Sequence, residues 1–173
     1  MGDELRGENL VHLNVRFSTE TELKKIQDFL YEKSGQGVSF TGLVEAMVNE
    51  VTIVTAVHNI KSNKGSKTAG VDKIKMDKYL QMPKDELILL IQSCFRNYRP
   101  KPARREYIEK SNGKKRPLGI PTVLDRIIQE CVRIIIEPIC EARFYPQSYG
   151  FRPYRAQKHA IRGIINVINA GCK

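Results

Sequence analysis

The stretch YIEKSNGKKRPLGIPTVLDR, residues 107–126, gathers five basic residues around an Asn-Gly pair. Short segments that can be extended flank Ser-Asn-Gly, and Asn and Gly accept the positive φ of a tight turn, so the pattern predicts a β-hairpin. Lysine and arginine side chains on a rigid hairpin can bind phosphate with little ordering cost. The chemistry expected here is therefore the binding of a polyanion, with an ordinary solvated charged turn as the alternative.

Two registers of this hairpin would pair its cations differently. A three-residue loop over Asn112–Lys114 places Lys110 opposite Arg116, whereas a two-residue Asn-Gly loop places Lys110 opposite Lys115. Either register puts two cations on one face, which is enough to hold a polyphosphate. The sequence leaves the choice of register open.

A second candidate is the loop QSYGFRPYR, which begins at Gln147. A glycine there permits close backbone approach, and aromatic rings stand among guanidinium groups, a combination suited to nucleic acid. An aromatic turn that packs on the core is the alternative. The residues concerned are Tyr149, Gly150, Phe151, Arg152 and Arg155.

The acidic residues form no catalytic pattern. Polymerase chemistry needs paired carboxylates that hold two Mg²⁺ ions, yet none of the six aspartates lies in a hydrophobic strand, and no Asp-Asp pair occurs. Asp125 follows Thr122 by three residues, which predicts a structural role at a helix start. We therefore expect no catalytic residue and no metal ligand in this chain.

Composition indicates one domain, or a piece of a larger protein, with an anionic partner. The 173 residues are 41% hydrophobic, which is enough for a core, and carry a net charge of +10. Two windows, residues 61–78 and 99–116, contribute +4 and +6 and so hold the whole excess. The positive charge is therefore confined to two short segments.

Cysteine usage and hydropathy predict a cytoplasmic protein without membrane contact. The cysteines form no CxxC pair, and three lie in apolar helical patterns, so we expect reduced core residues. No apolar run is long enough to span a membrane, and the polar start is unlike a signal peptide. The four are Cys94, Cys131, Cys140 and Cys172.

The elements that would position these residues are mostly helices, with a small antiparallel sheet built on the hairpin, which predicts an α+β fold. We expect a short strand over 11–17, helices over about 19–35, 41–60 and 83–97, the hairpin, a helix from 122 that ends at Pro138, and a last helix over 155–170. The last helix should bury its apolar face, which consists of Ala160, Ile161, Ile164, Ile165 and Ile168.

Three quoted segments together resemble a known family. They are YRPKPARREYIEKSNGKKRPLGIPTVLDRIIQECV, then FYPQSYGFRPYRAQKHAI, and upstream AVHNIKSNKGSKTAGVDKIK. They look like the fingers region of group II intron-encoded reverse transcriptases, the maturases, and the resemblance covers roughly residues 52–170. It implies that the intact parent copies RNA into DNA and assists splicing and retrohoming of its intron.

The resemblance also implies roles for single residues. Lys110 and Arg116 match positions that grip the triphosphate of the incoming nucleotide. The residues that match template or RNA contacts are Lys61, Lys64, Lys67, Arg104, Arg105, Lys114, Lys115, Gly150, Phe151, Arg152 and Arg155. Implied partners are group II intron RNA and, in the intact parent, an RNA template with a DNA primer and a dNTP.

The expected organisation is an N-terminal extension over 1–40, a helical block with a basic loop over 41–98, and the fingers hairpin and helices over 99–173. By resemblance, the palm and thumb are absent, and with them the aspartates that bind Mg²⁺ in the intact parent. We expect the fragment to bind RNA without catalysing DNA synthesis.

Two other functions stay open at this point. One is a non-catalytic module that recognises intron RNA. The other is a basic domain that self-associates, as a homodimer, through apolar helices left uncovered. Substitutions in the hairpin would impair polymerisation if the chain grips nucleotide, and RNA affinity if it only recognises RNA.

Overall fold

The computed structural model describes residues 9–13 and 15–171. Two short sheets and a set of helices make up the fold. In chain order the elements are β1 (Leu10–His12), α1 (Glu20–Gly35), β2 (Ser39–Thr41), α2 (Leu43–Met47), α3 (Glu50–Ser62), a 3-10 turn (Lys64–Lys67), α4 (Met76–Leu80), α5 (Lys84–Arg96), β3 (Arg104–Glu109), β4 (Lys115–Ile120), α6 (Val123–Arg143) and α7 (Gln157–Asn169).

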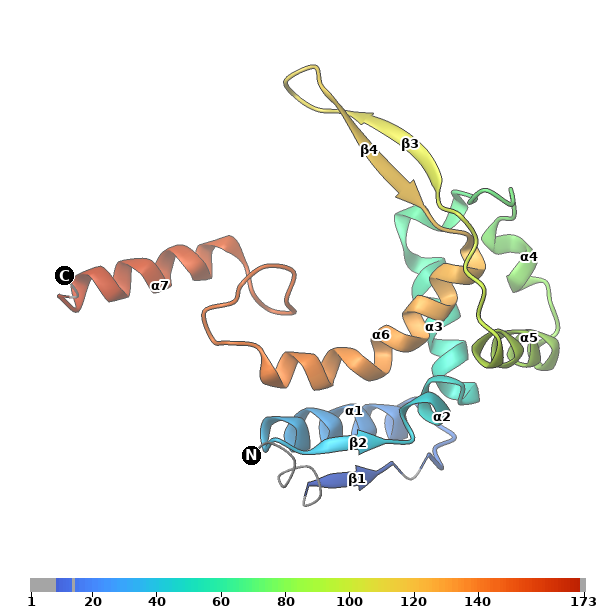
Figure 1. Ribbon diagram of the computed structural model, residues 1–173, viewed down its shortest axis with the longest axis horizontal. Coiled ribbons are helices and arrows are strands. Elements are labelled where there is room, and N and C mark those ends of the chain that lie inside the picture. The colour runs from blue at the N-terminus through green and yellow to red at the C-terminus, as the bar shows by residue number, and fades with distance from the viewer. Residues whose placement is uncertain (1–8, 14, 172–173) are drawn as a thin grey trace, which may run out of the picture.

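Helix α6 runs through the middle of the molecule (Figure 1). Helix α1 lies along one side of it, and α3 packs on it nearer its start. The antiparallel pair β3–β4 projects from the end where α6 begins, while β1 and β2 form a separate parallel ribbon beside α1. The expected α+β class, mostly helical with a small antiparallel hairpin, is confirmed.

The core gathers around α6. Leu30 of α1, Ile53 of α3, Ile91 of α5, and Ile127 and Ile135 of α6 are fully buried together. Burying a side chain of this size stabilises a fold by roughly 1.5–3 kcal/mol. The N-terminal helix is therefore part of the same core as the rest, although the sequence led us to divide residues 1–40 off as an extension.

Two local expectations near the N-terminus are wrong. The strand expected over 11–17 is limited to Leu10–His12, where it pairs with the unexpected β2. The single helix expected over 41–60 is broken between α2 and α3 because Asn49 is extended and caps α3, its side chain accepting from the Val51 amide at 2.8 Å. The same side chain donates to the carbonyl of Phe17 at 3.1 Å, which fixes the break.

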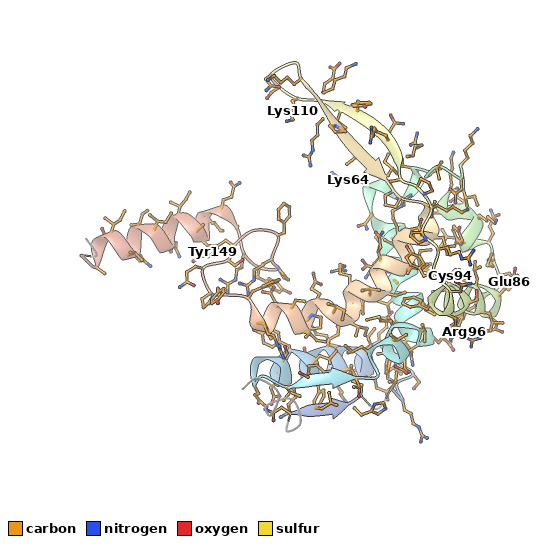
Figure 2. All side chains as sticks on the ribbon, in the orientation of Figure 1. Lys64, Glu86, Cys94, Arg96, Lys110 and Tyr149 are labelled. Atoms are coloured by element: carbon orange, nitrogen blue, oxygen red, sulfur yellow. The ribbon has the colours of Figure 1, made fainter. Side chains whose placement is uncertain are left out.

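Helix α7 does not bury its apolar face. Ile161, Ile164, Ile165 and Ile168 expose between 49% and 65% of their surface, and Ala160 is half-buried. The inward orientation expected for them is thus wrong. The reason is visible in Figure 2, where no other helix or strand of the described chain lies against α7.

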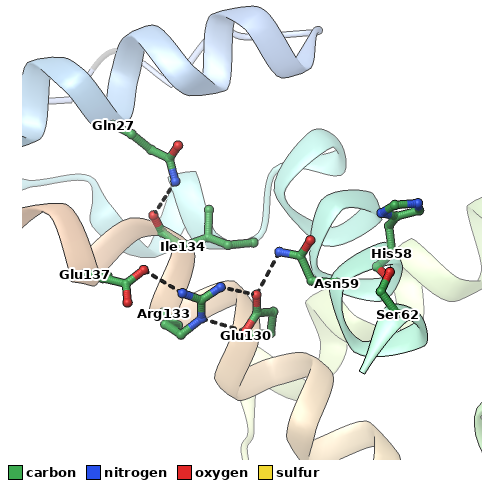
Figure 3. Close-up of polar contacts among 8 residues, drawn as sticks. All are labelled: Gln27, His58, Asn59, Ser62, Glu130, Arg133, Ile134 and Glu137. Atoms are coloured by element: carbon green, nitrogen blue, oxygen red, sulfur yellow. Dashed lines mark hydrogen bonds and ion pairs between the residues drawn. The ribbon is translucent and has the colours of Figure 1, made fainter. Parts of the chain in front are cut away.

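Helix α6 continues through Pro138 to Arg143, whereas the sequence placed its end at that proline. A proline in a helix removes the hydrogen bond to the carbonyl four residues earlier, here that of Ile134. Gln27 of α1 replaces it, because its amide nitrogen donates to the Ile134 carbonyl at 3.0 Å (Figure 3). Packing against α1 therefore lets α6 pass its proline.

Helices α3 and α6 are joined by a polar cluster at their interface (Figure 3). The carboxylate of Glu130 is nearly buried and accepts from Asn59 at 2.8 Å and from Arg133 at 2.6 Å. Burial alone would raise the pKa of Glu130, but hydrogen bonds from Arg133 and Asn59 and the charge of Arg133 hold it below its ordinary value. A charged Glu130 thus belongs to the folded state.

The three cysteines within the described residues carry free thiols, as expected. Cys131 lies in the core, where burial raises the pKa of its thiol to about 12. Cys94 and Cys140 are only half-buried. Cys172 lies outside the described residues.

Candidate nucleic-acid and nucleotide interface

The hairpin has a three-residue loop over 111–113, a register that differs from both registers expected. The Lys110 amide donates to the Lys114 carbonyl at 2.8 Å, and the Gly113 amide donates to the Lys110 carbonyl at 2.9 Å. Gly113 has φ +74, while the Asn112 side chain accepts from the Lys114 amide at 3.2 Å. Three-residue hairpin loops commonly consist of a turn followed by one residue in the left-handed conformation. Here that residue is Gly113.

This register decides which cations share a face. Lys110 lies opposite Lys114, and Arg116 lies opposite Ile108, so the expected pairings of Lys110 with Arg116 or Lys115 are wrong. Because side chains alternate along a strand, Lys110, Lys114 and Arg116 nevertheless project from the same face. We call these three residues the cation face.

The cation face stands in solvent. Its three side chains are exposed, and Lys110 lies at the tip of the projecting hairpin (Figure 2). Within the described residues, no carboxylate lies within ion-pair distance of them. Their charges are therefore available to an external anion.

The other basic residues of the hairpin are placed differently. Lys115 lies opposite Glu109 on the reverse face, and Arg105, opposite Gly119, shares that face. Arg104, at the base, donates through Nε to the Ala69 carbonyl at 3.1 Å and pairs with Glu106 at 2.5 Å. Arg104 thus ties the hairpin to the segment between α3 and α4.

That segment is the second basic window, and its lysines point outward. Lys61, Lys64 and Lys67 are exposed, and Lys64 lies near the base of the hairpin (Figure 2). The backbone of the segment faces inward instead. At Gly70 a Cβ would come within 2.6 Å of the Thr122 Cα, so only glycine fits this contact with the start of α6. We call residues 63–70 the basic loop.

Arg126, which the sequence did not single out as a functional residue, holds the basic loop. Its Nη1 donates to the Gly65 carbonyl at 2.8 Å, and its Nη2 donates to the Thr68 carbonyl. No spacing rule could have found this contact, because the partners lie 58 and 61 residues away. Only its place directly after Asp125 in the family-like stretch offered a signal.

Asp125 is a structural residue, as expected. Its carboxylate is buried, accepts from the Thr122 hydroxyl at 2.6 Å and from the Tyr98 hydroxyl at 3.0 Å, while its amide donates to Thr122 Oγ1 at 3.1 Å. Burial and the hydrogen bond to Asp125 raise the pKa of Tyr98 to about 12. These bonds fix the first turn of α6, from which the hairpin emerges.

The loop that follows α6, residues 144–156, is held by contacts of its own two arginines. Arg152 is almost fully enclosed: its guanidinium pairs with Glu141 at 2.7 Å and donates to the carbonyls of Tyr145 and Ser148, each at 2.9 Å. Arg155 donates to the Pro146 carbonyl at 2.6 Å and lies over the Tyr149 ring. Both arginines are thus engaged by the chain itself.

Two aromatic residues of this loop are fully exposed. Phe151 and Tyr154 have positive φ values of 58° and 57°, and their side chains contact almost nothing. Gly150 has open space around it. Aromatic rings held out on an otherwise pinned loop can stack on unpaired bases.

The structure therefore brings together only part of the predicted site. The hairpin and the basic loop meet at the start of α6, whereas the loop over 144–156 follows its other end. The 21 residues of α6 separate the two by about 30 Å. They form two surfaces.

Neither surface fits a metal ion. Across residues 9–13 and 15–171, no group of three or more His, Cys, Asp or Glu side chains could hold one. In the same part of the chain, no helix is both long and apolar enough to cross a bilayer.

The chain matches no family model, but it is similar to several proteins. Over 110 residues it is 46% identical to Protein YkfC of Escherichia coli, covering 60% of this chain and 27% of that protein. Over 127 residues it is 42% identical to the Group II intron-encoded protein LtrA of Lactococcus lactis, covering 72% and 21%. It is also 31% identical over 116 residues to the Nuclear intron maturase 1, mitochondrial, of Arabidopsis thaliana, covering 67% and 14%.

The shared segment includes most of this chain, but it spans only 14% to 27% of the length of these relatives. Two of the three are named for group II introns or intron maturation. The resemblance drawn from the quoted segments is thereby confirmed, and the chain belongs to the family of group II intron-encoded reverse transcriptases and maturases.

Proposed function

We propose that this chain is the part of an RNA-directed DNA polymerase and group II intron maturase that grips template RNA and the incoming nucleotide. The observation that carries the proposal is the cation face, where three cations without an ion-pair partner among the described residues share one exposed side of a projecting hairpin. The names of the relatives support the choice of enzyme class.

The cation face would bind the nucleotide triphosphate. Lys110 and Arg116 supply the charges, and Lys114, directly opposite Lys110, adds a third. An exposed pair of unit charges at 4 Å is worth only about 1 kcal/mol in water. We therefore expect weak nucleotide binding by the chain alone, and stronger binding where neighbouring parts of the intact protein exclude water.

The remaining cations would bind RNA, and in the chain alone, without nucleotide, RNA phosphates would occupy the cation face as well. Lys61, Lys64 and Lys67 point outward from the segment beside the hairpin, while Arg105 and Lys115 occupy the reverse face. At the far end of α6, Phe151 would stack on an unpaired base, a contact worth about 1–3 kcal/mol. Such contacts suit both a template and intron RNA.

The chain would bind without catalysing. Its described carboxylates gather at no metal site, so we propose that Mg²⁺ and the primer end are held by parts of the intact protein that this chain does not contain. This chain would orient the triphosphate and neutralise its charge. The chemical step would take place elsewhere.

The test is equilibrium binding of a fluorescent single-stranded RNA at several salt concentrations. We expect affinity to fall steeply with salt, because each phosphate that a cation neutralises releases counterions. Addition of Mg²⁺, dNTPs and a primer–template should yield no DNA. Salt-independent affinity would contradict RNA binding, and genuine nucleotide incorporation would contradict the absence of catalysis.

Self-association is a second candidate, favoured by α7. All five of its large aliphatic side chains expose about half of their surface or more. Pairing of two such faces would bury them in a homodimer. Both functions can coexist, since α7 lies away from the hairpin.

A further inference from the structure

We propose that Arg126 is a positioning residue for RNA binding: it contacts no RNA itself but holds the basic loop so that Lys64 and Lys67 face the ligand. This inference rests on the proposed function, because it concerns how the same interface is oriented.

The first support is where the guanidinium hydrogen bonds go. Nη1 and Nη2 of Arg126 donate to the carbonyls of Gly65, inside the 3-10 turn Lys64–Lys67, and of Thr68, directly after it. One planar group thus binds the turn and the residue that follows it. A lysine ammonium is a single point donor on a flexible stem and lacks this fork geometry.

The second support is that the guanidinium is turned into the protein. Its Nε is buried and has no partner within the described residues. Burial lowers the pKa of Arg126, and the nearby charge of Asp72 opposes that effect. A group placed this way is poorly presented to a phosphate, whereas the side chains of Lys64 and Lys67 are exposed.

The third support is that the adjoining backbone is fixed to the same place. Arg104 binds the Ala69 carbonyl at 3.1 Å, and Gly70 packs directly on the Pro121–Thr122 backbone. The start of α6 and the hairpin therefore hold the loop at four successive points. Of the residues that make these contacts, Arg126 is the one that binds the lysine-bearing turn itself.

The test is a double-mutant cycle on RNA binding. In the unsubstituted chain, Lys64→Ala with Lys67→Ala should reduce the slope of log affinity against log salt concentration by about 1.4. This is about 0.7 for each phosphate contact on a single strand. In an Arg126→Ala background the same pair should change affinity by less than about twofold, because lysines on a displaced turn make no contact to lose. Lys110→Ala should have the same effect in both backgrounds, since the hairpin is not displaced.

Arg126→Lys separates positioning from direct contact. It keeps the charge but loses the fork, so it should weaken RNA binding nearly as much as Arg126→Ala. Hydrogen exchange of the Thr68 amide, which donates to the Gly65 carbonyl at 3.0 Å, should become faster in both variants, and this readout needs no RNA.

Three results would decide against the inference. Near-normal RNA affinity of Arg126→Lys would mean that only the charge of Arg126 matters. Additive losses of affinity in the cycle would mean that Lys64 and Lys67 bind RNA independently of Arg126. Unchanged exchange of the Thr68 amide in Arg126→Lys would mean that Arg126 does not hold the turn, and this measurement remains available even if Arg126→Ala fails to fold. Failure of the unsubstituted chain to bind RNA would instead overturn the proposed function.

Discussion

The basic residues of this chain differ in what already surrounds them. Lys110, Lys114 and Arg116 are exposed and pair with no carboxylate in the described part of the chain, whereas Arg104, Arg126 and Arg152 donate to backbone carbonyls. Sequence reasoning recognised the positive charge but could not separate these groups, because the acceptors of Arg104 and Arg126 lie 35 or more residues away. The cations of the first group are the ones to test for ligand binding.

Nucleotide binding can be tested on individual lysines by chemical labelling. A dNTP at millimolar concentration should slow acylation of Lys110 and Lys114, because bound triphosphate covers the cation face. Lys25, exposed on α1 away from the hairpin, should react equally fast with and without nucleotide. Mass spectrometry measures the labelling. If the dNTP changed the acylation rate of none of the three lysines, nucleotide binding at the cation face would be excluded.

Gly70 can be tested through stability. Gly70→Ala should lower the free energy of unfolding by about 1–3 kcal/mol, since its Cβ would collide with the Thr122 backbone at 2.6 Å. The matched control is Gly35→Ala, whose Cβ would lie 4.0 Å from Ala142, and which should cost nothing. Urea denaturation measures both, and equal values for the two variants would refute the close contact.

Local sequence patterns predicted that helices exist more reliably than they predicted where each helix begins and ends. The helix expected over about 19–35 corresponds to α1, whose start is fixed by both hydrogen bonds of a capping box between Thr19 and Glu22. Pro138 was a sound local signal for a helix end that Gln27, 111 residues earlier, overrides. The hairpin was predictable from Ser-Asn-Gly, but its register depended on which residue took positive φ.

The α3–α6 interface should make stability depend on pH. The folded-state pKa of Glu130 lies below its ordinary value of 4.5, so its contribution is complete above that value and is lost as the pH falls through the folded pKa. Glu130→Gln should cost about 1–3 kcal/mol at neutral pH. It should also reduce the loss of stability as the pH falls below about 4.5.

Urea denaturation across this pH range provides the measurement. Asp28, an exposed residue of α1 paired with Lys24, supplies the control variant Asp28→Asn, which should leave the acid dependence nearly unchanged. If Glu130→Gln and the unsubstituted chain lost stability in parallel, the charged Glu130 would not be what joins α3 to α6.

For the whole molecule, α6 is the axis that separates two surfaces. The hairpin and basic loop lie at its start, and the aromatic loop and α7 follow its end. Sequence patterns identified the residues of both surfaces but ended the intervening helix at Pro138, so the full length of α6 between them was not predicted. One RNA strand would have to extend about 30 Å to touch both.

Self-association through α7 is a property of the whole molecule. Ile164→Asp, at an aliphatic residue with 61% exposure, should abolish the dimer by placing a charge in the paired face. Asn169→Asp adds the same charge at the end of the helix and should be neutral. Sedimentation at several concentrations measures this, and a concentration-independent monomer in the unsubstituted chain would exclude the dimer.

The central claim is that the cation face exists to bind a polyanion, and one comparison of RNA binding tests it most directly. Lys110→Ala with Lys114→Ala should lower the salt slope for single-stranded RNA by about 1.4. Lys24→Ala with Lys25→Ala, at exposed positions of α1, removes the same charge and should leave the slope nearly unchanged. Equal slopes for the two double variants would contradict the account, because net charge rather than the hairpin would then explain the binding.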